Sequence, residues 1–292
     1  MSAIAQPITN ATYRRGALLI TGATLFWSLA GLLARMVDTD PWTTLFWRSL
    51  CAGTFLLAYL FWRDGRRVPA GFRRLGRAGF GISVCFAISM ICFINALSLT
   101  TVAAVLIFQA AAPLFAAALA WLLIRERVSA GKIAAILASI VGVAIMVHGV
   151  SGAGGILGIA LSTVMSVTFA GTIVLARVRP DVPTTEASTI AVGLVALASF
   201  PMAQLHLSMP EFALMATFGV CQMGLALIMF TAGIRLIPAA DAGLISILET
   251  VLAPLWVWIA FAETPDTNTL IGGAVILAAV LSTVRAEPMP LP

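Results

Sequence analysis

Two charged side chains stand inside long apolar stretches of this sequence. Arg48 lies in LFWRSLCAG (45–53), and Glu249 lies in ISILETVLAPL (245–255). A guanidinium binds a carboxylate through paired N–H donors, and a carboxylate held away from water is suited to reversible protonation. For Arg48 we expect contact with a substrate carboxylate or a role in a gate. For Glu249 we expect proton coupling or contact with a substrate ammonium.

Each charge also has a structural interpretation that the sequence leaves open. Arg48 falls about 9 Å beyond Trp42 along a helix, at 1.5 Å per residue. From there its side chain reaches the outer headgroups of a membrane, or Asp38 or Asp40 in the preceding turn. Glu249, near the middle of its apolar stretch, would then stabilise helix packing as a neutral or arginine-paired side chain. At the same 1.5 Å per residue, Arg48 and Glu249 differ in depth by about 5 Å, so their side chains could form a direct ion pair.

Uncharged polar and aromatic residues complete the candidate binding site. Side-chain amides can bind the carboxylate and ammonium of an amino acid, and they also join helices by hydrogen bonds. Hydroxyls on helices often bond back to their own backbone, and a tryptophan within a span either lines a cavity or packs in the core. The candidates are Trp27, Ser28, Asn95, Gln109, Thr168, Gln222 and Ser246.

Other kinds of chemistry find little support in the sequence. The cysteines lie in apolar runs without a CxxC pair, and His148 and His206 lack partners at ligand spacing, so we expect no metal. Gly131-Lys132 lacks the remaining residues of a phosphate-binding loop, so we expect no ATP. HExxH, GxSxG and paired intramembrane aspartates are missing, which argues against an intramembrane enzyme. We therefore expect neither catalytic residues nor a cofactor.

The composition places these residues in a membrane. Of the 292 residues, 61% are hydrophobic and only 10% are charged. A soluble domain usually carries about 25% charged residues. This chain therefore lacks the polar side chains needed to cover a water-facing surface, and we expect lipid around it.

Stretches of about 20 apolar residues can cross a bilayer as helices. On that template the chain is an all-α membrane protein with ten transmembrane helices, separated by turn residues such as Asp38–Pro41 and Gly152–Gly155. The expected spans are 16–37, 42–62, 77–97, 100–123, 131–149, 155–177, 186–206, 211–235, 240–261 and 268–285.

The basic residues predict the orientation of these spans. Of the 17 lysines and arginines, all except Arg35 and Arg48 fall on one side if the N-terminus is cytoplasmic. Because basic residues concentrate in cytoplasmic loops, we expect both termini in the cytoplasm. The net charge of +5 therefore indicates membrane topology and contact with membrane lipids rather than nucleic acid. The arginine-rich segment 63–77 contributes most to this pattern.

The chain also resembles itself. Shifting the segment that begins at Ala96 by about 137 positions aligns Leu99 with Leu236, Trp121 with Trp258 and Glu126 with Glu263. Two repeats, 1–150 and 151–292, would each hold five helices, and an odd number inverts the second repeat. Inverted repeats with a site at the midplane are common in secondary transporters.

Small residues spaced four apart predict that the 131–149 and 268–285 spans pack closely within one chain. They are Ala134, Ala138 and Gly142 in the first span and Ala274, Ala278 and Ser282 in the second. We therefore expect a monomer or a weak homodimer.

The segments PLFAAALAWLLIRERVSAGKIAAILASIVGVAIM (113–146) and ETVLAPLWVWIAFAETPDTNTLIGGAVILAAVLS (249–282) resemble the drug/metabolite transporter superfamily, in particular its ten-helix members with two EamA-type domains. FWRSLCAG (46–53) supports the resemblance. The family's Glu-Pro pair is divided here between Ala112-Pro113 and Glu249-Thr250. The resemblance implies a bacterial inner-membrane exporter of amino acids or related metabolites, and the aromatic amino acid exporters are similar in overall character.

Together these observations predict a secondary transporter of amino acids or related small metabolites that works by alternating access, and export as its direction is implied by the resemblance alone. A passive facilitator or channel is the main alternative, and an intramembrane enzyme is the weaker one. Exchange of labelled for unlabelled substrate separates a carrier from a channel.

Overall fold

The computed structural model describes residues 10–37, 39–99, 102–125, 129–147, 156–261 and 267–285, and the regular elements within these ranges are helices. The elements of the first half are α1 (Asn10–Ser28), α2 (Ala30–Met36), α3 (Pro41–Asp64), the 3-10 helix η1 (Gly65–Arg67), α4 (Val68–Arg74), α5 (Gly76–Leu99), α6 (Val102–Ile124) and α7 (Ala130–Val147). Those of the second half are α8 (Ile156–Val178), α9 (Thr184–Ser199), η2 (Phe200–Met202), α10 (Met209–Thr217), the π-helix η3 (Phe218–Leu225), α11 (Ala226–Gly233), α12 (Ala239–Ser246), α13 (Leu248–Phe261) and α14 (Thr267–Arg285).

Six of the helical stretches in the described ranges are long and apolar enough to cross a membrane, which makes this a multi-pass membrane protein. They are Pro41–Arg74, Gly76–Ala96, Ile156–Val178, Thr184–Met202, Met209–Gly233 and Asp241–Ala260. Ile133–Gly142 and Leu270–Ala279 are shorter apolar helices. The expected all-helical fold is confirmed, whereas ten spans in two inverted repeats remain a prediction. The Glu126–Glu263 correspondence falls outside the described residues.

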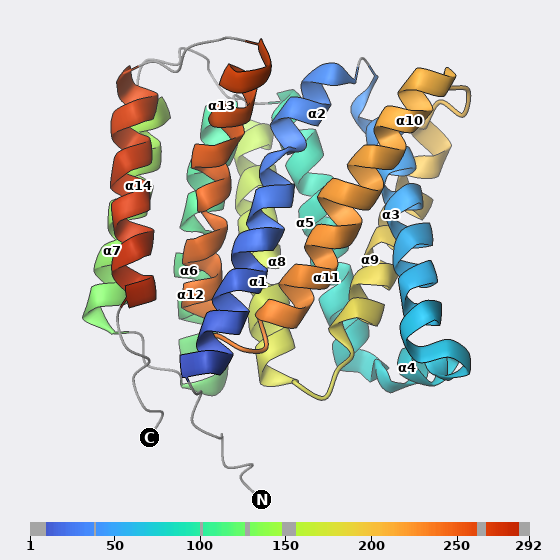
Figure 1. The fold of residues 1–292 in the computed structure, drawn as a ribbon, viewed down its shortest axis with the longest axis horizontal. Coiled ribbons are helices and arrows are strands. Elements are labelled where there is room, and N and C mark those ends of the chain that lie inside the picture. Colours follow the sequence, from blue (N-terminus) through green and yellow to red (C-terminus); the bar gives the residue numbers. More distant parts are fainter. Residues whose placement is uncertain are drawn as a thin grey trace, which may run out of the picture.

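The helices stand side by side and connect at two ends of the bundle (Figure 1). The chain direction alternates, so that α1 runs upward in the view and α3 downward, whereas α8 runs downward and α9 upward. Three helical stretches across the bundle are each divided into consecutive elements. α1 and α2 meet at Leu29, the π-helix η3 lies between α10 and α11, and α12 and α13 meet at Ile247.

Local sequence signals explain where α3 begins and ends. Asp40 Oδ1 accepts hydrogen bonds from the backbone N–H groups of Trp42 (2.9 Å) and Thr43 (3.0 Å), and Pro41 occupies the first turn. This is the capping chemistry expected of an aspartate before a helix. At the other end Gly65 has a φ of 53°, which favours glycine. Asp40 is therefore engaged as a helix cap, and it forms no ion pair with Arg48.

Contacts between helices of the first half and helices of the second half hold the bundle together. α7 packs against α14, and α3 packs against α9. In addition, α5 contacts α8 and α9, α6 contacts α8, and α1 contacts α11, α12 and α13. The α7–α14 contact is very close, because a Cβ on Gly142 would lie 2.8 Å from the carbonyl oxygen of Gly272. The predicted close packing of these two helices within one chain is observed.

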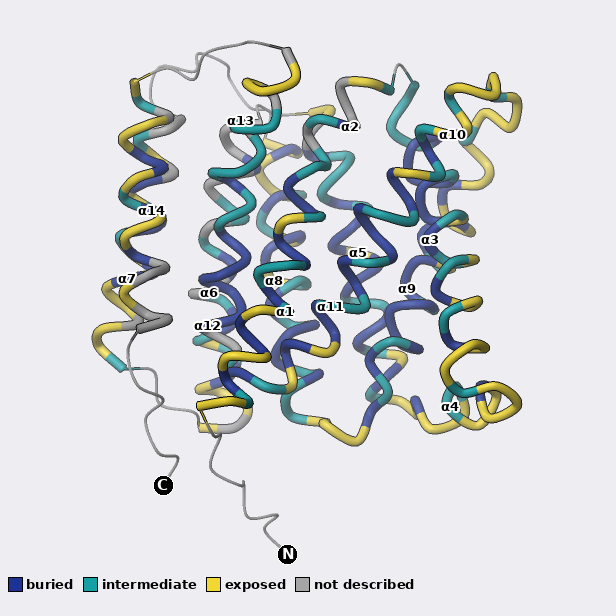
Figure 2. Tube along the Cα trace, viewed as in Figure 1, coloured by how far each residue is buried: buried dark blue, intermediate teal, exposed yellow. Residues whose placement is uncertain are grey.

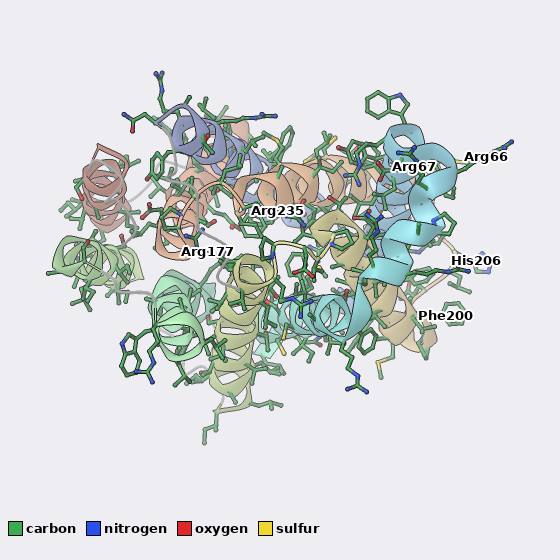
Figure 3. All side chains as sticks on the ribbon, turned by 90° about the horizontal axis from the view of Figure 1, so that it is seen from below. Arg66, Arg67, Arg177, Phe200, His206 and Arg235 are labelled. Atoms are coloured by element: carbon green, nitrogen blue, oxygen red, sulfur yellow. The ribbon has the colours of Figure 1, made fainter. Side chains whose placement is uncertain are left out.

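Buried residues lie on the inner faces of the helices, and exposed residues lie on the outer faces and at the ends of the bundle (Figure 2). The interior is built from buried apolar side chains such as Ile20, Leu56 and Phe230, whereas the outward face carries exposed ones such as Leu18, Leu197 and Ile156. A surface of this kind suits lipid, which is as apolar as the side chains that face it. Figure 3 looks onto the lower end, where Arg66, Arg67, Arg177 and Arg235 emerge from helix ends and connections.

The contact between α3 and η3 generates a first prediction. A Cβ on Gly219 would lie 2.5 Å from the Arg48 carbonyl oxygen and 2.7 Å from the Cys51 Cβ. Replacing Gly219 by alanine should force the two helices apart and cost about 1–3 kcal/mol of stability. Gly193 on α9 has nothing within 4 Å of its Cβ position, so Gly193→Ala is the matched control. Thermal unfolding in detergent should show a lower midpoint for Gly219→Ala only, and equal midpoints would contradict the contact.

Candidate functional site

A cavity of about 100 Å³ lies inside the bundle and is bounded by helices from both halves of the chain. One buried water needs only about 10–15 Å³, so the cavity has room for a small organic molecule. Its polar lining consists of Arg48, Ser89, Gln109, Ser166, Gln222 and Glu249, and its larger apolar lining includes Trp27, Phe86, Met90, Phe93, Met165 and Phe169. A smaller cavity of about 30 Å³ adjoins Trp27, Gln109, Glu249 and Ser246.

The irregular helix segments converge on this cavity. Trp27 precedes the break at Leu29, where the Leu29 N–H donates to the Phe26 carbonyl at 3.2 Å in a tightened turn. Gln222 lies within η3, and Glu249 lies directly after the break at Ile247. π-helical turns and helix breaks recur at functional sites, and in membrane proteins irregular backbone is tolerated where it lines a cavity. The apolar sequence at Leu29 and Ile247 carries no proline that would have predicted these interruptions.

Arg48 is buried in the cavity wall without a counter-ion. Only 3% of its surface is exposed, and its Nε atom has no hydrogen-bond partner. Its guanidinium carbon lies 5.2 Å from the centroid of the Phe218 ring, a cation–π contact. Within the described ranges no carboxylate pairs with it; Asp38 lies outside them. Because the Arg48 side chain is buried, it does not extend to the lipid headgroups. A buried cation without a counter-ion favours binding of an anionic group.

Glu249 faces the same cavity from the first turn of α13. Gln109 Nε2 donates a hydrogen bond to Glu249 Oε2 at 3.1 Å, and the carboxylate stands at the positive end of the helix dipole. No ion pair joins Glu249 to Arg48, although both line the cavity. The two charges are therefore available to separate parts of one ligand.

Two glutamine side chains present further acceptors. Gln222 Nε2 donates to the Trp27 carbonyl at 3.4 Å. Gln109 Oε1 and Gln222 Oε1 are buried and have no hydrogen-bond partner in the described part of the chain. Buried carbonyl oxygens without a donor are uncommon, because each loses its hydration without compensation. Both glutamines line the cavity together with Arg48, so two unpaired acceptors lie in its wall.

Aromatic rings form the apolar wall. Trp27 and Phe169 meet edge to face with ring centroids 6.1 Å apart, and Phe86 lies 6.2 Å from Phe169. Phe230 backs this wall, 4.7 Å from Trp27. Trp27 was among the residues expected at the cavity, whereas Phe86 and Phe169 were not. Their only signal in the sequence is their type, which is common in any apolar span.

The remaining sequence candidates lie differently. Ser28 Oγ accepts a hydrogen bond from Trp256 Nε1 at 2.7 Å, outside both cavities. Thr168 and Asn95 donate to the carbonyls of Val164 and Ile91 on their own helices and also lie outside the cavity walls. Ser246 borders the smaller cavity, with its hydroxyl donating to its own helix.

No group of three His, Cys, Asp or Glu residues in the described ranges is arranged to hold a metal ion. Of the sequence candidates, five line the main cavity: Trp27, Arg48, Gln109, Gln222 and Glu249.

Comparisons with known proteins agree with this architecture. The profile described as the EamA-like transporter family matches residues 14–148 and again residues 156–285. A solved structure titled "Crystal structure of protein" shares the fold, with 19% identity, a TM-score of 0.78, and coverage of 92% of this chain and 96% of the other. None of the curated proteins compared with the chain matches it. The chain belongs to the EamA-like transporter family.

The hydrogen bond between Ser28 and Trp256 yields a second prediction. Ser28→Ala removes the acceptor of a partly buried indole N–H, which should cost about 1 kcal/mol of stability. Substrate affinity should stay unchanged, because Ser28 does not line the cavity. Thr168→Val is the matched control, since it removes a hydroxyl bonded only within its own helix. Thermal unfolding and ligand titration on both variants test this, and a weaker affinity in Ser28→Ala would place Ser28 in the binding site.

Proposed function

We propose that the protein is a secondary transporter that exports amino acids or related small metabolites across the bacterial inner membrane by alternating access. The observation that carries the proposal is the buried guanidinium of Arg48, which has no counter-ion in the described chain and faces a cavity with unpaired acceptors. A zwitterion with an apolar side chain complements the three features of this cavity, namely the cation of Arg48, the unpaired acceptors and the aromatic wall.

The roles of the lining residues follow from their chemistry. Arg48 binds the substrate carboxylate through its N–H donors. Glu249, Gln109 Oε1 and Gln222 Oε1 accept hydrogen bonds from the substrate ammonium. Trp27 and Phe169 contact the apolar side chain. Glu249 is also the candidate for proton coupling, because a carboxylate beside a substrate ammonium can exchange its proton for the substrate.

Alternating access is supported by the reciprocal packing of the two halves. The family profile matches each half once, and α1 and α8, the first long helices of the two matches, run in opposite directions (Figure 1). The contacts correspond as well: α5 on α8 has its counterpart in α11 on α1, and α6 on α8 has its counterpart in α13 on α1. α3 on α9 and α7 on α14 pair equivalent helices. These are the contacts expected of two inverted repeats around a two-fold axis.

The location and direction of transport rest on broader arguments. Arginines gather at the lower end of the bundle, which is the cytoplasmic end by the positive-inside rule (Figure 3). Both termini then lie in the cytoplasm, because α1 begins and α14 ends at that same end (Figure 1). Export as the direction, and an inner membrane as the location, follow from the family resemblance.

The third prediction tests Arg48 by substrate counterflow in proteoliposomes. Arg48→Gln should lower the exchange of labelled for unlabelled amino acid about tenfold or more, because a charge-assisted hydrogen bond contributes about 1.5–3 kcal/mol. Arg15→Gln makes the same chemical change at an exposed position and should leave exchange intact. Gel filtration confirms that both variants fold.

Two results would count against the proposed function, one for the role of Arg48 and one for the substrate class. Full exchange by Arg48→Gln would assign Arg48 to packing. Absence of accelerated exchange with every amino acid in a broad panel would remove amino acids as the substrate class, and a passive channel shows no such exchange with any substrate.

The fourth prediction concerns Glu249. Glu249→Gln preserves an oxygen acceptor for Gln109 but removes the titrating group. If Glu249 carries the coupling proton, the variant should retain exchange while uptake driven by an imposed pH gradient is lost. Glu211→Gln changes an exposed helix-capping carboxylate on α10 and serves as the control. A gradient response of wild-type size in Glu249→Gln would exclude this residue from coupling.

A further inference from the structure

A short segment between α3 and α5 carries a dense group of exposed arginines. It consists of η1 and α4, and it lies across the lower end of the bundle rather than along it (Figure 1). We call its Arg66, Arg67, Arg73 and Arg74, together with Arg77 in the first turn of α5, the basic platform. All five side chains are exposed, and none forms an ion pair with a carboxylate in the described part of the chain.

The acidic residue directly before this segment does not neutralise the platform. Asp64, the one acidic residue of 61–77, is held by Arg63, whose Nε and Nη2 atoms donate to it at 3.0 and 2.6 Å. Arg63 Nη2 also contacts Glu186 Oε1 at 3.3 Å. The nearby carboxylates are thus engaged by Arg63, which leaves the five platform charges to an external partner.

The platform is fixed in place. Val68 and Leu75, at the two ends of α4, are 3% and 5% exposed and anchor the segment to the bundle. Gly71 lies against the Glu186 side chain on α9, so close that a Cβ would be 2.8 Å from Oε1. One face of α4 is therefore packed against protein, while Arg73 and Arg74 on its other face point outward.

The position along α3 sets the depth of the platform in the membrane. α3 has 24 residues, and at 1.5 Å per residue it is about 36 Å long, slightly more than the roughly 30 Å hydrocarbon core. Phe61 and Trp62, in its last turn, are 56% and 83% exposed. Aromatic side chains of this kind occupy the membrane interface. The basic platform therefore lies at the level of the lipid headgroups.

We propose that the basic platform is a binding site for anionic phospholipid headgroups, with Phe61 and Trp62 contacting the adjoining acyl chains. Clusters of arginine directly beyond a transmembrane helix attract anionic lipids by charge. Guanidinium groups also bind phosphate oxygens in a bidentate manner. A lipid satisfies both parts of this surface, whereas an acidic soluble protein or free phosphate would leave the exposed aromatic pair without a partner.

The test measures lipid selectivity of the purified full-length protein. The protein is incubated with micelles that contain equal amounts of phosphatidylglycerol and phosphatidylcholine, and the lipids retained after gel filtration are quantified by mass spectrometry. Wild-type protein should retain phosphatidylglycerol in about fivefold excess or more, since each arginine near a charged surface contributes about a factor of five. Substituting Arg66, Arg67, Arg73 and Arg74 by glutamine should bring the ratio close to that of the mixture.

The control removes three other exposed arginines at the same end, namely Arg14, Arg15 and Arg125. It should keep most of the enrichment, and Arg73→Gln with Arg74→Gln alone should lose about half of the logarithmic effect. An equal loss in the control would overturn the proposal in favour of general surface charge. Unchanged enrichment in the platform variant would also overturn it. So would displacement of the lipid by excess glycerol phosphate or by a polyglutamate peptide, because those results assign the surface to a soluble anion or an acidic protein.

Discussion

The burial of Arg48 is the constraint on which the arrangement of the cavity depends. Its backbone is packed tightly against η3, because Gly219 lets that helix approach the Arg48 carbonyl. Its side chain is covered, and its charge is met inside the described protein only by the face of Phe218. A cation in apolar surroundings is costly, and this unpaired charge is the basis for the anionic substrate group that we propose. Irregular helix segments lie beside this cavity, since Trp27, Gln222 and Glu249 are all at or near them.

Contacts between the halves of the sequence give this cavity its walls. α1 packs with α11, α12 and α13, whereas α8 packs with α5 and α6, so each group contains helices from both matches to the family profile. The cavity lies where these groups face each other, with Trp27 and Gln222 from one and Phe86 and Phe169 from the other. The repeat in the sequence therefore does not correspond to two separate bundles. α3 packs against η3 and α9 packs against α5, so the α3–α9 contact links the two groups.

Much of this fold could be predicted from the sequence, because lipid forces the backbone to satisfy its hydrogen bonds within helices. Turn residues such as Asp40 marked helix ends, and the charges of Arg48 and Glu249 indicated a site because charge at that depth is expensive. The breaks at Leu29 and Ile247 could not be predicted, since neither position carries a helix-breaking residue. Phe86 and Phe169 were missed because a wall and a core use the same residue types. Ser28 was expected at the cavity, but its hydroxyl bonds to Trp256 instead.

The contacts at the lower end of the bundle differ in kind from those around the cavity. Tyr13 donates a hydrogen bond to Asp241 at 3.1 Å, and Ser83 donates one to the Ala187 carbonyl at 2.7 Å. Each joins the first half of the chain to the second near a membrane surface. Water can replace the partners of such polar groups when they separate, so their loss costs about 0.5–1.5 kcal/mol each. Water offers no such substitute for the contacts of the apolar cavity walls. Under the alternating access proposed above, separating these polar contacts would therefore cost less than separating the apolar cavity walls.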